Sequence, residues 1–460
     1  MTEGAPTPPV AAATATVDTT GTPPRPPTAP PADALPPANG KRAVPEYDGR
    51  EPPAPTAREG FAWIPRLVLS PAYLTSEYVV RRPIIGLVRW GEAHYVWRRI
   101  YDAATWDGGR AGVYPTANVD LGLKQTAGLS LFWHDFGRPA SSLSASASGG
   151  IDVLSAGARE RLGVFRDHTG AVTMRAGYSR RPDGIFYGIG PDSRVEDRVY
   201  FGFTTIGGGI GLDGKLGGLS HAVLDLGYRR AAFRSSPTDG PDIRDRYGGP
   251  GQPPLPAGFE GYELVEPRAL LLLDSRDPNA EVPGGTGARL ELAGGYAIDP
   301  ARTDIQYASW GGQGAVFYDA SGAGHVLGAA VDVRFVEPIG AHDVPFSELP
   351  ALGGNETMRG FLAGRLRGPS TFTAALQYRY PFWAFVDGEL FSEVGNAFGA
   401  HLDGIDPRRM FLSYGGALRT TFSRETSISM TLAFATSRFD EPAFSWRDNV
   451  RFSIGVNNGF

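Results

Sequence analysis

The sequence predicts an all-β protein, a 16-stranded antiparallel transmembrane β-barrel, and three observations lead to that prediction. First, from about residue 110 onward the chain holds about sixteen segments of roughly ten residues in which apolar and polar residues alternate, and a tilted strand of that length crosses a bilayer. Second, aromatic residues gather at the ends of these segments. Third, the face opposite the apolar one is small and polar rather than rich in Lys and Glu.

The last segment, VRFSIGVNNGF, shows the alternation most clearly, and TSISMTLAFATS and TFTAALQYRYPF follow the same pattern. Alternation also suits a soluble sandwich, which turns its apolar face inward and its polar face to water. A barrel turns its apolar face to lipid and its polar face to the lumen, and the small, polar second face favours this arrangement. In the last segment the apolar face consists of Val450, Phe452, Ile454 and Val456.

The composition excludes several classes of protein. A formal net charge of -5 and a pI of about 5.9 do not suit a nucleic-acid binder. The absence of cysteine excludes a disulfide framework and Cys-bound zinc. No run reaches the roughly 18 apolar residues of a transmembrane helix. The start, MTEGAPTPPV, lacks the features of a secretory signal. The chain is therefore either cytosolic or exported by a signal outside this sequence, and the barrel prediction favours the second.

Two segments are expected before the barrel of residues 110–460. Residues 1–60 hold 15 of the 39 prolines and should form a disordered Pro/Ala-rich segment, either a spacer or a Pro-rich partner motif. Residues 61–109 predict an extended piece and then an amphipathic helix over about 84–104. This helix packs on the domain's own core, lies at a membrane interface or plugs the barrel. At an interface its anchors would be Trp90, Tyr95 and Trp97.

A long Gly-rich stretch between two predicted strands contains LGGNETMRGF, with Arg359, Gly360 and Phe361. An arginine that points into a confined lumen needs an acidic or polar partner. Strand parity places Gln377 on the polar face of the next strand and Glu393 on a face of the strand after it. A guanidinium bound there would hold the loop inside the barrel. The alternative is a solvated surface arginine without a partner.

The succession LGGNETMRGF, ALQYRYPF and LFSEVGNAF resembles the bacterial surface antigen family, within the BamA/TamA superfamily. In that family an Arg-Gly-Phe/Tyr motif on a long loop folds back into the barrel, and its arginine contacts acidic or polar residues of the two following strands. The resemblance implies these roles here: Arg359, Gly360 and Phe361 form the lumenal loop motif, and Gln377 and Glu393 are its partners. Glu393 stands where the family usually has Asp, and Gln377 where Glu is common.

Further stretches extend the resemblance over about residues 110–460. FYGIGPDSRVEDRVYFGF is similar to an early barrel hairpin of relatives, and LLLDSRDPNAEVPGGTGARLEL to the family's Asp-x-Arg-Asp…Pro-x-x-Gly hairpin. A terminal aromatic residue resembles the signal by which outer-membrane barrels are recognised for assembly. The hairpin residues are Asp274, Arg276, Asp277, Pro283 and Gly284, and the C-terminal assembly signal is Phe460.

The resemblance implies a barrel in the bacterial outer membrane, in contact with its lipids, that inserts unfolded barrel clients or translocates other polypeptides. The implied mechanism is a seam between the first and last strands that opens. Relatives carry polypeptide-transport-associated domains before the barrel, and residues 1–109 show no such pattern. The alternative is therefore a pore or a surface interaction barrel without assembly activity.

We expect no enzyme, cofactor, metal or nucleic-acid partner. The glycine-rich run at 209–214 spells a dinucleotide fingerprint, but it precedes a strand pattern instead of a helix. The run DSRDPNAEVPGG lacks the spacing of a calcium loop. The seven histidines are scattered without ligand spacing. No catalytic residue is predicted.

Overall fold

The structure is a computed structural model that describes Gly86, Trp90 and residues 94–164, 169–276, 285–302, 304–319, 324–383, 386–420 and 426–458. The expected disordered segment and the expected assembly signal Phe460 lie outside these residues. So do Asp277, Pro283 and Gly284 of the predicted hairpin.

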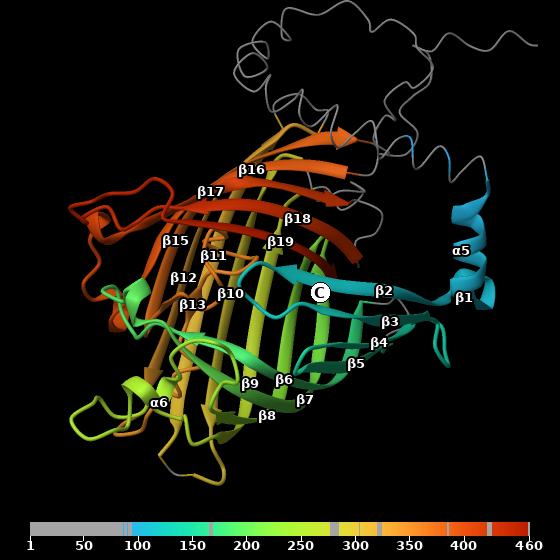
Figure 1. The fold of residues 1–460 in the computed structure, drawn as a ribbon. Coiled ribbons are helices and arrows are strands. Elements are labelled where there is room, and N and C mark those ends of the chain that lie inside the picture. Colours follow the sequence, from blue (N-terminus) through green and yellow to red (C-terminus); the bar gives the residue numbers. More distant parts are fainter. Residues whose placement is uncertain are drawn as a thin grey trace, which may run out of the picture. The chain divides into compact units, whose positions relative to one another are not determined.

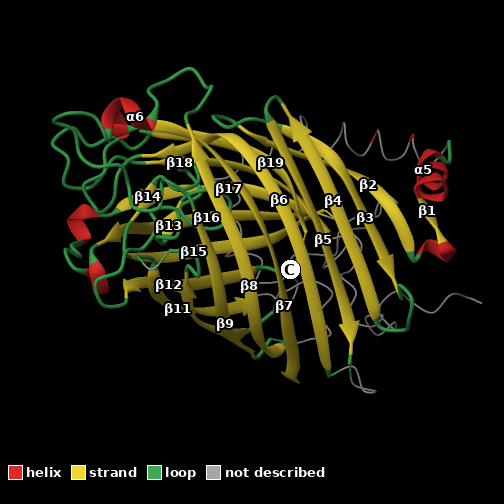
Figure 2. Cartoon of the chain, turned by 90° about the horizontal axis from the view of Figure 1, so that it is seen from below, coloured by secondary structure: helices red, strands yellow, loops and turns green. Residues whose placement is uncertain are grey.

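Sixteen strands of a 17-stranded antiparallel sheet close into a barrel in the described part of the chain, and the seventeenth strand is a two-residue piece paired with the first of them (Figures 1 and 2). In chain order the strands are β2 (Ala111–Asp120), β3 (Thr126–His134), β4 (Ser141–Gly150), β5 (Val153–Gly163), β6 (Gly170–Phe186), β7 (Val199–Gly217), β8 (Ser220–Arg234), β9 (Tyr262–Asp274), β10 (Gly287–Ile298), β11 (Gln306–Asp319), β12 (Val326–Pro338), β15 (Ser370–Trp383), β16 (Val386–Phe398), β17 (Phe411–Thr420), β18 (Thr426–Ala435) and β19 (Asn449–Asn458).

Each strand of the barrel pairs with the next along the chain, β12 pairs with β15, and β19 returns to β2. The predicted 16-stranded antiparallel barrel is therefore confirmed. The strand lengths are less uniform than expected, since β3 has 9 residues and β7 has 19. The long strands arise because the ladder between β6 and β7 continues as far as the pair of Phe186 and Val199.

Two-residue alternation along the strands separates an outer apolar face from an inner polar one. On β19, Val450 is 49% exposed on the outside, whereas Arg451 and Ser453 are buried on the inside. On β15, Leu376 points outward and is 65% exposed. The strands therefore present apolar side chains around the outside of the barrel and charged or small ones to the lumen.

The three longest connections, residues 235–261, 339–369 and 436–448, lie at one end of the barrel, here called the long-loop end. At the other end, the short-turn end, β7 and β8 are joined by two residues, 218–219. A buried aromatic core lies at this long-loop end, where Phe346 packs edge-to-face against Phe186 and Phe201. This core ties the loops to the inner barrel wall.

Few helices accompany the sheet. The described ones are α5 (Val96–Ala104), α6 (Ile243–Arg246) and the short 3-10 turns η4 (Asp107–Gly109), η5 (Val195–Asp197), η6 (Ala400–Leu402) and η7 (Pro407–Arg409). The remaining short strands are β1 (Thr105–Trp106), β13 (Ala351–Leu352) and β14 (Leu366–Arg367).

The expected helix over about 84–104 corresponds, in the described residues, to α5. Its residues Ile100 and Tyr101 are 54% and 55% exposed, so these two side chains do not pack on a core. The interfacial and plug alternatives stay predictions. None of the helices in the described part of the chain combines the length and apolar character needed to span a membrane.

Candidate functional site

Residues 339–369, here called the lumenal loop, join β12 to β15 and fold back against inward-facing residues of the barrel. The two-residue strands β13 and β14 pair with each other, so the loop closes on itself around its central turn. Apolar side chains of the loop pack with residues of β16, β17 and β18. This cluster consists of Leu352, Met358, Phe361, Leu366, Ala397, Phe411 and Ala435.

Arg359 reaches from the lumenal loop to the inner face of β16. Its Nε donates to Glu393 Oε1 at 2.8 Å, and its Nη1 donates to Glu389 Oε1 at 2.6 Å. Its backbone N–H donates to Glu393 Oε2 at 2.8 Å. The guanidinium carbon lies 3.4 Å from the centre of the Phe391 ring. Because the three charged side chains are only 3–8% exposed, these charge-assisted bonds are shielded from water.

Gly360 and Phe361 complete the motif by close packing. The N–H of Gly360 donates to Ser413 Oγ of β17 at 2.8 Å. A Cβ at position 360 would lie 2.3 Å from the carbonyl oxygen of Phe434, so only glycine fits against β18. Phe361 is buried and meets the Phe411 ring edge-to-face, with ring centres 5.4 Å apart. The motif thus combines a charged anchor, a close backbone approach and an apolar contact.

The structure brings Arg359 and Glu393 together, but it does not bring Gln377 to them. In the described residues no hydrogen bond joins Gln377 to Arg359, and Glu389 supplies the second acceptor instead. Gln377 lies beside Gly328 of the neighbouring strand, where a Cβ would approach its Cγ to 2.7 Å. The missing side chain at Gly328 leaves room for Gln377 to fold toward β12. The proposed partnership of Gln377 is therefore wrong.

In the predicted hairpin, Asp274 and Arg276 form a buried pair at the short-turn end of the barrel. Arg276 Nε donates to Asp274 Oδ1 at 2.9 Å and its Nη2 donates to Oδ2 at 2.5 Å. The guanidinium also lies 4.5 Å from the centre of the Phe317 ring. The pair stabilises the turn after β9.

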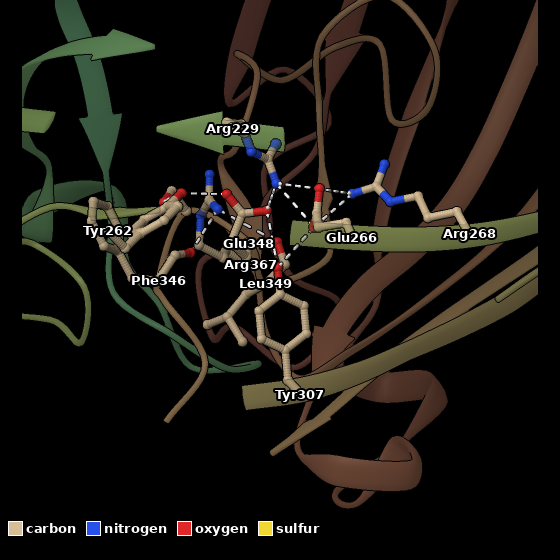
Figure 3. A network of polar contacts seen from close by, with 10 residues as sticks. Arg229, Tyr262, Glu266, Arg268, Tyr307, Phe346, Glu348, Leu349 and Arg367 are labelled. Atoms are coloured by element: carbon tan, nitrogen blue, oxygen red, sulfur yellow. Dashed lines mark hydrogen bonds and ion pairs between the residues drawn. The ribbon is translucent and has the colours of Figure 1, made fainter. Parts of the chain in front are cut away.

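A second anchor holds the lumenal loop on strands β8, β9 and β11 (Figure 3). The carboxylate of Glu348 accepts hydrogen bonds from Arg229 Nη2 and from Tyr262 OH. Arg229 also donates to both oxygens of Glu266 at 3.2 Å, and Tyr307 OH donates to Glu266 Oε1 at 3.2 Å. The loop is therefore fixed to two walls of the barrel, at Glu348 and at Arg359.

Two further arginines near the end of the lumenal loop donate hydrogen bonds to a serine hydroxyl and to backbone carbonyls. Arg365 donates through Nη1 to Ser193 Oγ at 2.9 Å and through Nη2 to the Ser193 carbonyl at 3.0 Å. Arg367 donates to the carbonyl of Phe346 at 2.8 Å. Burial lowers the pKa of both guanidiniums. The hydrogen bonds compensate in part for the loss of water around these charges.

The seam between the first and last strands is short. Strands β19 and β2 share three residue pairs, Ser453 with Asp120, Ile454 with Val119 and Gly455 with Asn118. The neighbouring ladder between β18 and β19 has ten. One further backbone bond, from Leu121 N–H to the Phe452 carbonyl at 3.1 Å, extends the seam. The barrel is therefore closed least firmly at this junction.

Next to the seam, one side of β2 pairs with two different strands. The strand β1 pairs with residues Ala111 and Gly112 at the start of β2. Pairing with β19 begins only at Asn118 and continues to Asp120 at the end of β2. On its other side, β2 pairs with β3 along residues 111–118.

We expect Glu393→Gln to loosen the loop anchor without removing it. The amide keeps one acceptor oxygen but places an NH₂ group beside donors from Arg359 and Ser413. A hydrogen bond to a charged group is worth about 1.5–3 kcal/mol, so the loss should stay in this range. The heat-induced gel shift of the purified barrel in detergent should move to a lower temperature. A wild-type transition would show that the Glu393 contact contributes nothing to stability.

In the portion of the chain that the structure covers, no three His, Asp or Glu side chains gather closely enough to bind a metal ion. The polar groups of the site instead bind one another. The arrangement fastens the lumenal loop to the inner wall of the barrel.

Comparisons with known proteins agree with the geometry. Residues 271–458 match the Omp85 superfamily domain. No curated protein sequence matches the chain. The structure of BamA from Haemophilus ducreyi lacking POTRA domains 1-3 is similar, with a TM-score of 0.53 at 14% identity, over 76% of this chain and 70% of that chain. Such a likeness concerns the fold alone.

Two structures of CdiB also match, each with a TM-score of 0.48. CdiB from Acinetobacter baumannii shares 10% identity over 76% of this chain and 60% of that chain. CdiB from Escherichia coli shares 14% over 75% and 62%. The chain thus spans less than two thirds of either CdiB. The superfamily match agrees with the resemblance inferred from the Arg-Gly-Phe loop: residues 271–458 match the Omp85 superfamily domain, and the barrel has the fold seen in BamA.

Proposed function

We propose that this barrel spans the bacterial outer membrane and inserts or translocates polypeptides through the junction of β2 and β19. The observation that supports the proposal most is the short seam, with three residue pairs. A client strand that separates β19 from β2 and pairs with one of them would gain main-chain hydrogen bonds, which is how sheet edges bind extended segments.

The exterior of the barrel supports a membrane location. Outward-facing residues such as Ile206, Leu226 and Leu376 are half-exposed or more, and lipid is the environment that suits them. In lipid an unpaired backbone group costs several kcal/mol, so a junction of three pairs is a weak point that a client strand can relieve. Outer-membrane lipids and unfolded barrel polypeptides are therefore the proposed partners, and the proposed activity involves no enzymatic chemistry.

A pore or surface interaction barrel without assembly activity is the second candidate. A cavity of about 610 Å³ lies inside the wall of β5–β10 and favours this candidate. Both signs of charge line it, including Arg159, Arg175, Asp225 and Glu291. Such a lining suits hydrated ions or small polar solutes. The lumenal loop, fixed on two walls, would then narrow the passage.

The first experiment measures folding. The purified protein is reconstituted in liposomes, a urea-denatured small outer-membrane barrel is added, and its folding is followed by gel shift. Faster folding than in empty liposomes supports insertion by the barrel. No acceleration, beside a working positive control, refutes insertion of such clients, and conductance across a planar bilayer then tests the pore.

A disulfide across the seam tests whether clients enter the membrane through the junction of β2 and β19. Because the chain has no cysteine, the pair Val119→Cys and Ile454→Cys introduces the only thiols, on residues that face each other across the junction. We expect oxidation to abolish the acceleration and reduction to restore it. The matched control joins Ile454→Cys to Met430→Cys, which face each other between β18 and β19. Full activity with the oxidised seam would exclude opening of this junction.

A further inference from the structure

One arginine of the last strand bridges the seam and the lumenal loop. Arg451 of β19 points into the barrel and is 2% exposed. A guanidinium has five N–H donors, and acceptors stand around every nitrogen of this one. Its Nε donates to Asp120 Oδ1 at 2.9 Å and its Nη2 to Asp120 Oδ2 at 2.6 Å. This bidentate ion pair joins the last strand to the first at Asp120, the final residue of β2.

The remaining donors of Arg451 bind the lumenal loop. Its Nη1 donates to the carbonyl of Gly354 at 2.6 Å and to the carbonyl of Arg359 at 3.1 Å. Its Nη2 donates a second bond to Asn355 Oδ1 at 2.7 Å. Five hydrogen bonds thus account for the five donors. Replacing any acceptor leaves a buried cationic donor without its partner, which costs more than an ordinary hydrogen bond.

Other contacts strengthen the same connection. Asn449 at the start of β19 donates from Nδ2 to the carbonyl of Gly360 at 2.6 Å. Ser453, which pairs across the seam with Asp120, donates to Asn355 Oδ1 at 3.2 Å. The loop segment 354–360 therefore touches the last strand at three successive inward-facing residues. Its other side is held on β16 through Arg359.

We propose that Arg451 and Asp120 form a polar latch that closes the seam, and that the lumenal loop controls this latch. The inference rests on the proposed opening of the seam and extends it. Three residue pairs provide little backbone pairing, so a buried bidentate ion pair is a large part of what joins β19 to β2. Because one guanidinium serves both Asp120 and the loop, moving the loop removes acceptors from the side chain that holds the seam. While the lumenal loop is bound to Arg451, the junction stays closed. When the loop moves away, β19 can separate from β2.

Hydrogen exchange of the intact protein in lipid nanodiscs tests the latch without any client. Asp120→Asn keeps the shape of the side chain and removes its charge. We expect amides of 111–120 and 449–458 to exchange roughly tenfold faster, a change equivalent to about 1.4 kcal/mol in the opening equilibrium. Amides of the β10–β11 ladder should keep wild-type rates. Unchanged exchange at the seam, or an equal rise in every strand, would overturn the latch.

A change confined to the loop tests the coupling. Asn355→Ala removes one acceptor of Arg451 and belongs to neither seam strand, yet it should speed exchange at the seam by roughly threefold. The matched control is Glu348→Gln, which loosens the same loop at its far anchor on β8 and β9. It should raise exchange within the loop and leave the seam unchanged. A seam that responds to Glu348→Gln as strongly as to Asn355→Ala would refute a specific latch.

The two proposals fail in distinguishable ways. If Asp120→Asn and Asn355→Ala open the seam but the wild-type barrel does not accelerate client folding, the latch stands and the insertion proposal falls. If the barrel accelerates folding and neither variant changes exchange at the seam, insertion stands and the latch falls. Should Asp120→Asn fail to fold, Asn355→Ala alone decides the coupling, since it leaves the Arg451–Asp120 pair in place.

Discussion

Arg359→Ala should lower the heat resistance of the barrel strongly and raise its ion conductance. The substitution leaves Glu389 and Glu393 buried at 5% and 3% side-chain exposure without the cation between them. Breaking a buried ion pair by removing one partner costs about 3–5 kcal/mol. The contact with the Phe391 ring is lost as well. The loop then loses one of its two wall anchors, so its segment near the seam no longer holds a fixed place in the lumen.

Two measurements follow this change. The unfolding temperature in detergent is read from the heat-induced gel shift, and conductance is recorded in planar bilayers. The control is Arg302→Ala, because Arg302 pairs with Asp304 at the surface, where an ion pair is worth at most about 1 kcal/mol. If Arg359→Ala and Arg302→Ala unfold at the same temperature, the lumenal anchor does not stabilise the barrel.

The barrel itself could be predicted because alternation is a local property of the chain. Parity along a strand decides which side chains share a face, and it placed Gln377 on the polar face of its strand without any knowledge of the register. The position of the loop motif could also be predicted, because an arginine followed by a phenylalanine is unusual in a long glycine-rich loop between strands. The inward fold of the loop was implied by the resemblance to the surface antigen family, because the residues alone also allowed a solvated arginine at position 359.

Parity does not reveal which inward residues meet across the lumen. Gln377 faces inward, as expected, but the bare backbone of Gly328 lets its side chain fold away from Arg359. Glu389 has the same parity as Glu393, so it was an equally possible partner of Arg359. Nothing in the sequence favoured Glu389 over Gln377. Glu348 had no local signal at all, because its partners Arg229 and Tyr262 come from strands more than 80 residues away.

The seam was beyond prediction for a related reason. The strand pattern around Ile454 indicates a residue well able to pair, yet only three pairs form with β2. That number depends on the stagger of all sixteen strands around the closed barrel, which no single strand encodes. The bond between Arg451 and Asp120 spans 331 positions of the chain and depends on the same stagger.

Gly360→Ala should displace the lumenal loop even though it removes no hydrogen-bonding group. A Cβ at this position would lie 2.3 Å from the carbonyl oxygen and 2.6 Å from the carbonyl carbon of Phe434. Both atoms belong to the backbone of β18, so a side-chain rotation cannot relieve the clash. We expect a loss of stability of about 1–3 kcal/mol, as for other overpacked sites, with the loop shifted away from β17 and β18.

The displacement has a specific consequence, because Gly360 is fastened on both sides. Its N–H donates to Ser413 and its carbonyl accepts from Asn449 of the last strand. Gly360→Ala should therefore speed hydrogen exchange at β19 as well as in the loop. The control is Gly314→Ala on β11, where nothing lies within 4 Å of the added Cβ and exchange should match the wild type. Faster exchange in the loop with an unaltered β19 would mean that the Arg-Gly-Phe motif stabilises the loop but does not communicate with the seam.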